Sequence, residues 1–552
     1  MTTDDNVPKA TTASEGVPAP EGPANLIDTD YVIGQDNIAT TKWGVDLDLH
    51  GKVFTVSSLV ILAFVILTLA MQAEIKPVFE AIFDFVTGNL SWVFLLGSNL
   101  FVLVSVVLIF TPLGRVRLGG AHASPEFSYA GWFSMLFAAG MGIGLMFYGV
   151  SEPLTHFGTA MSGTTVENGV RTDWAPLAGA AGNPEAATSL GMAATILHYG
   201  VHPWGSYAIV GLALAIFAFN KGLPLTMRSI FYPVLGERVW GWPGHVIDIL
   251  AVFATLFGLA TSLGLGASQA TAGLSYLFGV PNTNLSMVLL VTGITAVALV
   301  SIMLGVDKGV QRLSQLNMVL AFLLLVFLIV VGPTLLIAAG FFENLAAYVV
   351  HLPALSNPFG RADANFSQGW TAFYLAWWIS WSPFVGMFIA RVSRGRTVRE
   401  FLIAVLLVPT LVAVLWIAAF GGTAIDQVVN KGFEGVQDAA LELQLFVMLG
   451  QLPLAAITST VGIILVIVFF VTSSDSGSLV IDSITAGGKV DAPKPQRIFW
   501  AIIEGAIAIA LLLGGGLKAL QSAAVSTGLP FTLVLMVACY ALVKALMSEP
   551  RN

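Results

Sequence analysis

Phe137–Pro153 reads FAAGMGIGLMFYGVSEP, and it lies in an apolar run long enough to cross a bilayer. Gly140, Gly142 and Gly144 occupy alternate positions in its middle. Each glycine costs a helix about 1 kcal/mol relative to alanine, so the helix is weakest here. Within lipid, an interrupted backbone is tolerated only where protein or a polar cavity satisfies its amides and carbonyls. Because glycine-interrupted apolar segments mark the binding sites of secondary transporters, this stretch predicts a solute and ion site at the break.

The composition is that of a polytopic membrane protein. Only 10% of the 552 residues are charged and 56% are hydrophobic, whereas soluble domains carry about 25% charged residues. Residues 1–50 are rich in Pro, Gly and Thr, and their charged residues are nine acids and two lysines. This composition is typical of disorder, and the negative charge argues against a nucleic-acid partner. We therefore expect residues 1–50 to form a disordered acidic cytoplasmic arm.

Twelve apolar segments of about 20 residues or more follow, as membrane-spanning helices require. We expect these spans near residues 52–73, 91–111, 127–152, 186–219, 244–278, 286–305, 314–340, 366–391, 400–421, 453–474, 497–514 and 527–547. With a cytoplasmic N-terminus, every cytoplasmic connection carries at least two Lys or Arg residues, while each outer connection carries one. Because basic residues favour the cytoplasmic side, the sequence predicts twelve spans in the cell membrane with both termini inside.

The third and eighth spans each contain an interruption near mid-membrane, at the glycines described above and at Pro383. Two five-helix units that begin with such spans in opposite orientations form an inverted repeat, a plan common among secondary transporters. The connection after the seventh span begins FFENLAAYVVHL, whose apolar spacing predicts a helix lying on the outer surface. We therefore divide the chain after the arm into two peripheral helices (51–126), a first five-helix repeat (127–340), the amphipathic surface helix and its loop (341–365), a second repeat (366–547) and a short cytoplasmic end (548–552).

Aromatic side chains cluster in two proline-bearing spans. Those of the eighth span share one helical face, because their spacing is three or four residues: Phe373, Trp377, Trp381, Phe384 and Phe388. Trp378 lies beside them, and the fourth span adds Tyr199, Trp204 and Tyr207. A dry ring face binds a quaternary ammonium with about 2 kcal/mol, so the cluster predicts a cage for such a group. The alternative is packing or an interfacial aromatic belt, but the position away from the span ends favours the cage.

Hydroxyl side chains indicate where a cation binds. Thr472, Ser473 and Ser474 follow one another in the tenth span, and hydroxyls beside an unwound helix coordinate Na⁺ in transporters of this plan. The alternative is that each hydroxyl bonds only the preceding turn of its own helix. The fifth span also carries hydroxyls, at Thr255 among others, together with glycines that packing alone explains.

Three ionisable residues within the apolar segments carry plainer expectations. Glu152 ends the third expected span, so we expect it to be solvated at the membrane edge or to cap the next element. His198 and His202 are spaced i, i+4 but have no nearby carboxylate or cysteine in sequence, which favours packing over a metal site. No ATP-binding loop or hydrolase motif appears, so an enzyme is disfavoured and any uphill work must come from an ion gradient.

Four motifs, in order along the chain, carry a family resemblance: GMGIGLMFYGVSEP, HPWGSY, AWWISWSPFVGMFIARVSRGRTVREF and FFVTSSDSGS. They resemble the betaine/carnitine/choline transporter family, and most of all its Na⁺-coupled glycine betaine carriers of Gram-positive bacteria. The resemblance implies an all-α membrane protein with twelve transmembrane helices. Its core would be LeuT-like, with two inverted five-helix repeats formed by the third to seventh and the eighth to twelfth helices. It also implies a homotrimer, with Na⁺ as coupling ion and no other cofactor or metal.

The resemblance also implies site residues. The substrate cage would be formed by Tyr199, Trp204, Tyr207 and Trp378, with Trp377 and Trp381 on the route inward and with Met141 and Gly142 at the break. One Na⁺ would bind the backbone of Ala138, Met141 and Phe469 and the hydroxyls of Thr472 and Ser473. A second would use Thr255, with Phe384 nearby.

Four positions bear on the substrate and the ion. Betaine carriers tend to have tryptophan where this chain has Tyr199, which changes the cage. A second hydroxyl expected one turn after Thr255 is replaced by Leu259, which weakens the second Na⁺ site. Gly144 stands where choline carriers place an acid, so a zwitterion is favoured. Residues 249–280 lack the fixed arginine of Na⁺-independent carnitine exchangers, which favours Na⁺ coupling.

The sequence therefore predicts a Na⁺-coupled symporter that imports a zwitterionic quaternary ammonium or related compatible solute by alternating access, with glycine betaine first. The alternative within the family is an ectoine or proline carrier. The alternative of another class is a passive channel, which would require a more continuous polar lining than these few clustered hydroxyls.

Overall fold

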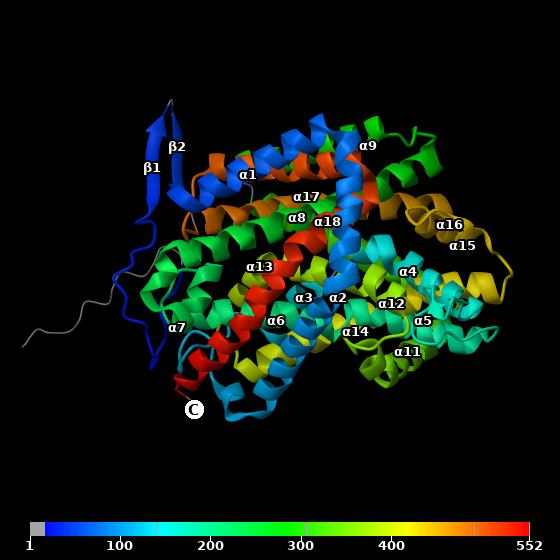
Figure 1. Cartoon of the computed structure of the whole chain (residues 1–552), viewed down its shortest axis with the longest axis horizontal. Coiled ribbons are helices and arrows are strands. Elements are labelled where there is room, and N and C mark those ends of the chain that lie inside the picture. The colour runs from blue at the N-terminus through cyan, green and yellow to red at the C-terminus, as the bar shows by residue number, and fades with distance from the viewer. Residues whose placement is uncertain (1–16, 43, 141, 305–306, 491, 551–552) are drawn as a thin grey trace, which may run out of the picture.

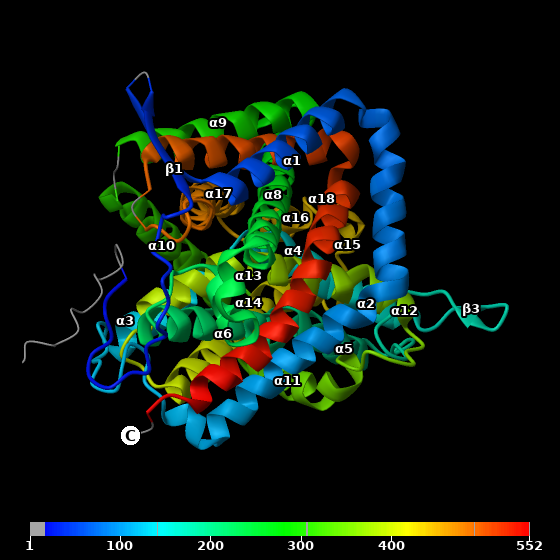
Figure 2. The same ribbon diagram turned by 60° about the vertical axis from the view of Figure 1, so that its left-hand side comes forward.

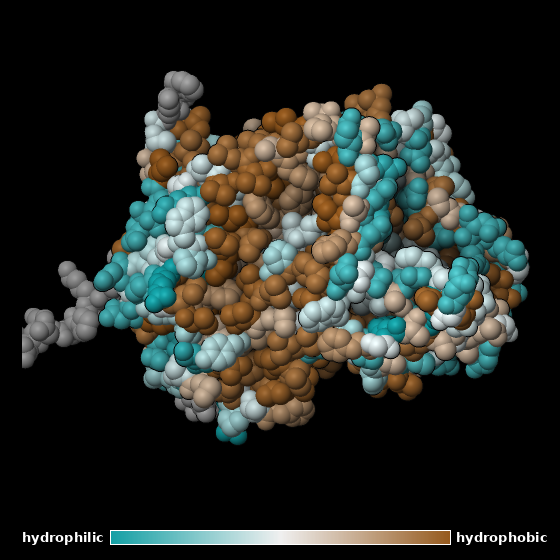
Figure 3. Space-filling model, viewed as in Figure 1, coloured by the Kyte–Doolittle hydropathy of each residue, from teal (hydrophilic) through white to brown (hydrophobic). Residues whose placement is uncertain are grey.

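The computed structural model describes residues 17–550, except residues 43, 141, 305–306 and 491. Most described residues belong to helices, which pack against one another at several angles (Figure 1). In the same view, apolar side chains form a broad band between two polar ends (Figure 3). An apolar band between polar ends is the surface that a bilayer requires. The predicted all-α membrane fold is confirmed.

The helices that build the band are α1 (Gly51–Ala70), α2 (Gln72–Phe110), α3 (Tyr129–Gly140), α4 (Ile143–Ser162), α5 (Pro184–Tyr199), α6 (Val201–Ala215), α8 (Trp242–Phe278), α9 (Asn284–Leu304), α10 (Asp307–Val331), α13 (Ala372–Val392), α14 (Val398–Val429), α17 (Ala455–Thr485) and α18 (Lys494–Met547). Helices α3 and α4 form one span bent by 65°, and α5 and α6 together form another. At about 1.5 Å per residue, the 54 residues of α18 are too long for one crossing. This helix has non-helical backbone angles at Gly515 and Gly516, so it forms the eleventh and twelfth predicted spans.

Shorter elements lie at the two polar ends. One end holds the arm strands β1 (Asn37–Lys42) and β2 (Val45–His50), with η1 (Pro112–Arg115), η2 (Ile216–Asn220), η3 (Met227–Phe231), α7 (Tyr232–Leu235) and η4 (Gly236–Trp240). The other end holds β3 (Val166–Glu167), β4 (Val170–Arg171), α12 (Ala364–Phe366), η5 (Ser367–Thr371), α15 (Gly435–Asp438) and α16 (Gln444–Gly450). Figure 2 shows β3 projecting on the side away from the C-terminus and the arm. We call these two sides the arm face and the opposite face.

The prediction of a disordered arm is wrong for residues 17–50, while residues 1–16 lie outside the described part of the chain. Strands β1 and β2 form an antiparallel hairpin. The acidic side chains of the arm meet basic residues of the connections: Glu21 lies 2.8 Å from Arg394, and Asp48 pairs with Lys489. Composition missed this because the partners of the arm are distant in sequence.

Helix α11 (Thr334–Leu355) is long and apolar enough to cross a membrane, although the sequence predicts a surface helix there. The connections after α6 and after α13 limit the number of crossings between them. The connection after α6 lies on the arm face, because the backbone amide of Ile27 in the arm bonds the carbonyl of Lys221. The connection after α13 lies there too, because Thr397 pairs with Arg117, which follows η1, in an isolated bridge. Helices α8, α9, α10 and α13 supply four crossings between them, an even number that returns the chain to the arm face, so α11 is not a further crossing.

The interruptions differ in part from those predicted. Gly142 is extended, with φ −167° and ψ −175°, as expected for a break between α3 and α4. Helix α13, in contrast, runs unbroken through Pro383. An interruption that the sequence analysis missed lies at Gly200, between α5 and α6. The division into two inverted repeats stays a prediction.

Candidate solute-binding site

The break between α3 and α4 opens onto a small cavity of about 60 Å³. Its walls come from α3, α4, α6, α8, α13, α14 and α17: Ala139, Gly142, Ile143, Gly144, Leu145, Tyr199, Pro203, Trp204, Tyr207, Ser262, Trp377, Trp378, Trp381, Val385, Pro409, Ala413 and Ser473, with Tyr199 at the end of α5. None of these described lining residues is acidic or basic. The aromatic and uncharged lining suits a small organic solute without net charge.

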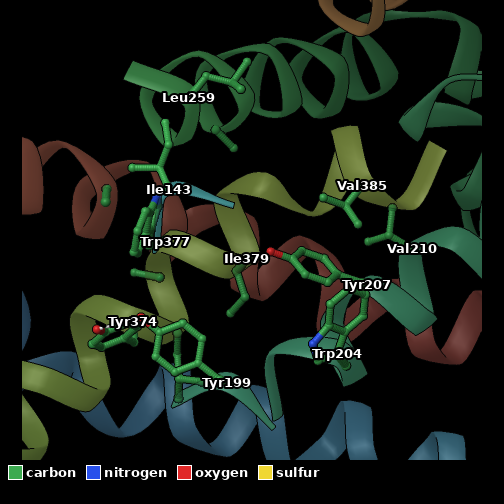
Figure 4. Packing of buried hydrophobic residues seen from close by; sticks show 14 of the residues in the cluster. Ile143, Tyr199, Trp204, Tyr207, Val210, Leu259, Tyr374, Trp377, Ile379 and Val385 are labelled. Atoms are coloured by element: carbon green, nitrogen blue, oxygen red, sulfur yellow. Dashed lines mark hydrogen bonds between the residues drawn. The ribbon is translucent and has the colours of Figure 1, made fainter. Parts of the chain in front are cut away.

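Aromatic rings form most of the wall. Trp377 and Trp378 stack with centroids 4.7 Å apart and planes 13° apart. Tyr199 meets Trp378 edge-on at 5.7 Å, and Tyr207 meets the same indole at 6.5 Å. Trp204 lies beside Tyr207 on α6 (Figure 4), with centroids 5.1 Å apart. The structure therefore brings all six predicted cage aromatics to one cavity, although they lie up to 182 positions apart in the chain.

Hydrogen bonds hold several of these rings in place. Trp377 Nε1 donates to Ser262 Oγ at 3.1 Å, and Trp378 Nε1 donates to the carbonyl oxygen of His198 at 2.6 Å. The hydroxyl of Tyr199 donates to the carbonyl oxygen of Gly144 at 3.1 Å, which links the cage to the broken helix. Trp381 Nε1 is buried without a hydrogen-bond partner in the described chain. Because Trp381 lines the cavity, its indole N–H is a candidate donor to an anionic group of a bound solute.

Gly144 is needed for close approach rather than for an unusual backbone conformation. A methyl group there would lie 3.1 Å from Trp378 Cη2 and 3.2 Å from Trp377 Cη2, closer than ordinary van der Waals contact. Gly142 also lines the cavity, as predicted. Met141 lies outside the described residues.

The predicted residues of the first sodium site are only partly brought together. Ser473 and Ala139, the neighbour of Ala138, line the same cavity. Phe469 is buried one turn earlier on α17. Thr472 Oγ1 donates to the carbonyl oxygens of Val468 at 3.0 Å and Phe469 at 3.3 Å, within its own helix. This is the alternative in which the hydroxyl bonds the preceding turn, although the oxygen lone pairs remain available to a cation.

The predicted second sodium site has fewer oxygen ligands. Thr255 Oγ1 donates to the carbonyl oxygen of Ala251 at 2.8 Å within α8. Phe384 lies on α13 against Trp381, with centroids 5.4 Å apart. Leu259 fills the space beside Gly477, where a methyl group would lie 2.3 Å from Leu259 Cδ1. The position one turn after Thr255 is thus occupied by packing rather than by a hydroxyl.

The expectation for Glu152 is wrong, while packing of His198, which the sequence favours over a metal site, stays a prediction. Glu152, His156 and His198, which we call the Glu152 cluster, are fully buried beside the cage. Glu152 Oε1 lies 2.5 Å from His198 Nδ1 and 3.1 Å from His156 Nε2. Glu152 and His198 are 46 residues apart, so the sequence analysis had no local signal that would join them. His202 is separate from the cluster and contacts Asn99 at 2.8 Å.

Tyr374 is a further residue that the sequence analysis missed. Its ring stacks on His198, with centroids 4.6 Å apart and planes 7° apart, and its hydroxyl lies 3.1 Å from the hydroxyl of Tyr199. Figure 4 shows Tyr374 and Tyr199 beside each other. Its position one turn before Trp377 and Trp378 was the available signal, because residues spaced three or four apart share a helix face.

Comparisons with known proteins agree on one family. The model of the betaine/carnitine/choline family transporters matches residues 52–551. The chain is 63% identical over 536 residues to a glycine betaine/proline/choline transporter of Vibrio parahaemolyticus, covering 97% of each chain. It is 51% identical to a glycine betaine/proline/choline/ectoine transporter of the same organism, covering 94% of this chain and 91% of that one. A glycine betaine transporter of Bacillus subtilis is 42% identical, over 85% of this chain and 89% of that one.

Among solved structures, a mutant manganese transporter of Eremococcus coleocola is similar with a TM-score of 0.42 and 12% identity. The similarity covers 78% of this chain and 81% of that one.

Proposed function

Because the chain belongs to the betaine/carnitine/choline transporter family, we propose that it is a secondary active, Na⁺-coupled symporter that imports glycine betaine. The family consists of transporters, so the protein is a compatible-solute transporter and not an enzyme. Relatives named for glycine betaine support this substrate. The proposal also includes a homotrimer in the cell membrane with cytoplasmic termini and a role in osmoregulation.

The uncharged aromatic cavity at the helix break carries this proposal. A quaternary ammonium loses little by desolvation and gains from several ring faces, so it needs no counter-charge. The carboxylate of a betaine needs a donor, and Trp381 Nε1 is a buried donor on the cavity wall without another partner in the described chain. The two ends of a zwitterion therefore each have a matching group.

Sodium coupling rests on the position of Ser473. Ser473 lines the cavity together with Ala139. Ala139 lies three residues before the extended backbone at Gly142. Hydroxyl and carbonyl oxygens are the ligands that Na⁺ uses beside discontinuous helices. Each Na⁺ that crosses supplies about 2.3 kcal/mol per 100 mV of membrane potential, which is sufficient to drive accumulation.

Tyr199 supports a second candidate, a carrier with a wider range that includes proline and ectoine. A phenol has a smaller ring face than an indole, so the cage depends less on a quaternary ammonium. Two relatives from Vibrio parahaemolyticus are named for proline as well as betaine, and one of them also for ectoine.

Binding and uptake in the purified protein test the proposal. Glycine betaine, proline, ectoine, carnitine and choline are added to protein in Na⁺ buffer and in K⁺ buffer, and uptake into proteoliposomes is measured with and without an inward Na⁺ gradient. We expect saturable glycine betaine uptake that requires Na⁺. Linear flux that is indifferent to Na⁺ would instead identify a passive channel.

A further inference from the structure

The geometry of the Glu152 cluster suits a buried carboxylate held by two imidazoles. One carboxylate oxygen, Glu152 Oε1, lies at hydrogen-bond distance from a nitrogen of each of two imidazoles, at 2.5 and 3.1 Å. An ionised carboxylate is an acceptor only and suits two N–H donors at one oxygen. The other nitrogen of His198 lies 3.0 Å from Thr371 Oγ1, a hydroxyl that donates as well as accepts. An ionised Glu152 between two neutral imidazoles would give the cluster one net negative charge.

The same geometry disfavours a metal ion in the Glu152 cluster. The three candidate ligand atoms lie within 4.8 Å of one another. However, the contact of 2.5 Å between Glu152 Oε1 and His198 Nδ1 has the length of a short hydrogen bond. Two ligands that each lie about 2.0–2.2 Å from a tetrahedral zinc would be more than 3 Å apart.

The cluster is in direct contact with the walls of the cage. The ring of His198 stacks on Tyr374, whose hydroxyl lies 3.1 Å from that of Tyr199. The backbone carbonyl of His198 accepts the indole proton of Trp378. Glu152 lies eight residues beyond Gly144 on α4, which places the two about 12 Å apart along the helix. Glu152 is the nearest carboxylate to the cavity on this helix, and no acidic side chain lines the cavity itself among the described residues.

The neighbouring ionisable groups do not cancel this charge. Arg361, on the connection that leads into α13, is paired with Asp363 at 2.8 Å. Tyr374, Tyr148 and Tyr199 surround the cluster as neutral phenols. A charge in such a low-dielectric setting is weakly screened and acts over the distance to the cavity.

We propose that Glu152 is a specificity-determining residue whose buried charge, behind the cage wall, allows the cage to bind solutes with a net positive charge such as choline. The charge attracts a monovalent cation, whereas the two ends of a zwitterion largely offset one another. Because position 144 is a glycine, no acidic side chain lines the cavity among the described residues. The negative charge of Glu152 therefore acts from behind the cage wall. This inference rests on the proposed function, because it assumes that the cavity binds quaternary ammonium solutes.

Competition binding with choline and glycine betaine tests the proposal in wild-type protein and in Glu152→Gln, at one pH and one Na⁺ concentration. Two unit charges about 12 Å apart at an effective dielectric constant of about 20 change a binding constant about tenfold. We therefore expect Glu152→Gln to weaken choline binding about tenfold more than glycine betaine binding. Glu185→Gln, which removes an exposed acid from the first turn of α5, is the matched control and is expected to leave the ratio unchanged.

A second variant keeps the test decisive if Glu152→Gln does not fold. His156→Leu removes one of the two donors to Glu152 and favours the protonated acid, so choline binding falls relative to betaine binding in the same direction but less. Equal losses for both solutes in the folded variants would overturn the inference and leave the proposed function intact. So would wild-type protein that binds betaine but not choline, or stoichiometric zinc in wild-type protein that Glu152→Gln lacks. Wild-type protein that binds neither solute overturns the proposed function as well.

Discussion

Replacing Trp378 tests the cage most directly. One face of this indole is covered by Trp377 at 4.7 Å, so the ring offers a single free face to the cavity. Its Nε1 donates to the carbonyl oxygen of His198, which fixes the ring without using the solute. Trp378→Leu removes both the face and the hydrogen bond, whereas Trp378→Phe removes the hydrogen bond and keeps a smaller face. The difference between the two variants isolates the contribution of the ring.

The expected magnitude follows from one lost contact. A dry cation–π contact is worth about 2 kcal/mol, and about 1.4 kcal/mol is tenfold, so Trp378→Leu should raise the dissociation constant for glycine betaine about 30-fold. Trp378→Phe should raise it about fivefold, because a benzene ring attracts a cation less than an indole. Trp92→Leu is the control, since Trp92 is 40% exposed on α2 and bonds only its own helix. We expect that variant to stay within about twofold of wild type.

Equilibrium binding of radiolabelled glycine betaine to purified protein measures these constants, and gel filtration with thermal unfolding checks that each variant is folded. Unchanged binding in Trp378→Leu would refute the cage. Equal losses in Trp378→Leu and Trp378→Phe would refute the role of the ring face and assign the effect to the hydrogen bond with His198.

Three further changes test other parts of the structure. Gly144→Ala places a methyl group 3.1 Å from Trp378 and 3.2 Å from Trp377, so the affinity for glycine betaine should fall about threefold with normal expression; an unchanged affinity would contradict the close approach. Thr472→Ala combined with Ser473→Ala should raise the Na⁺ concentration for half-maximal uptake about tenfold, and an intact Na⁺ response would move the ion elsewhere. Burial and the nearby Arg228 guanidinium lower the pKa of His50 to about 3, so the docked arm holds His50 neutral. Above about pH 6.5 a released His50 is neutral too, and the free energy of arm docking does not change with pH. Below about pH 6.5 only the released His50 binds a proton, so this free energy falls by about 1.4 kcal/mol per pH unit down to about pH 3. Limited proteolysis should therefore cut residues 17–50 about tenfold faster at pH 5.5 than at pH 7.5, and His50→Gln should remove that difference.

The sequence predicts well what depends on spacing within one helix. Apolar length located the spans, and the glycines at 140–144 located the break, because both are local properties of the chain. The cage residues on α6 and α13 were recognisable since aromatic rings repeat every three or four positions. Pro383 misled the prediction, because neighbouring helices in a packed membrane protein can support a proline within a continuous helix.

Contacts between distant segments were beyond the sequence analysis. Glu152 looks like a residue at a membrane edge when only α4 is considered, and its burial depends on His198 of α5 and the ring stack on Tyr374. The arm looks disordered by composition, yet its acids pair with basic residues more than 370 positions away. Composition and periodicity describe neighbouring residues only, so ion pairs and ring contacts between distant segments could not be predicted from them.

The hydroxyl of Tyr199 gives the pocket a mechanical property that an indole at this position would lack. It tethers one wall to the carbonyl of Gly144, so the ring cannot swing aside unless that tether is cut. A bulky occupant that presses on the phenol therefore pulls directly on the discontinuous segment, two residues from the extended backbone at Gly142. The size of a bound solute therefore acts on Gly142 and Gly144, which line the same cavity as Ser473.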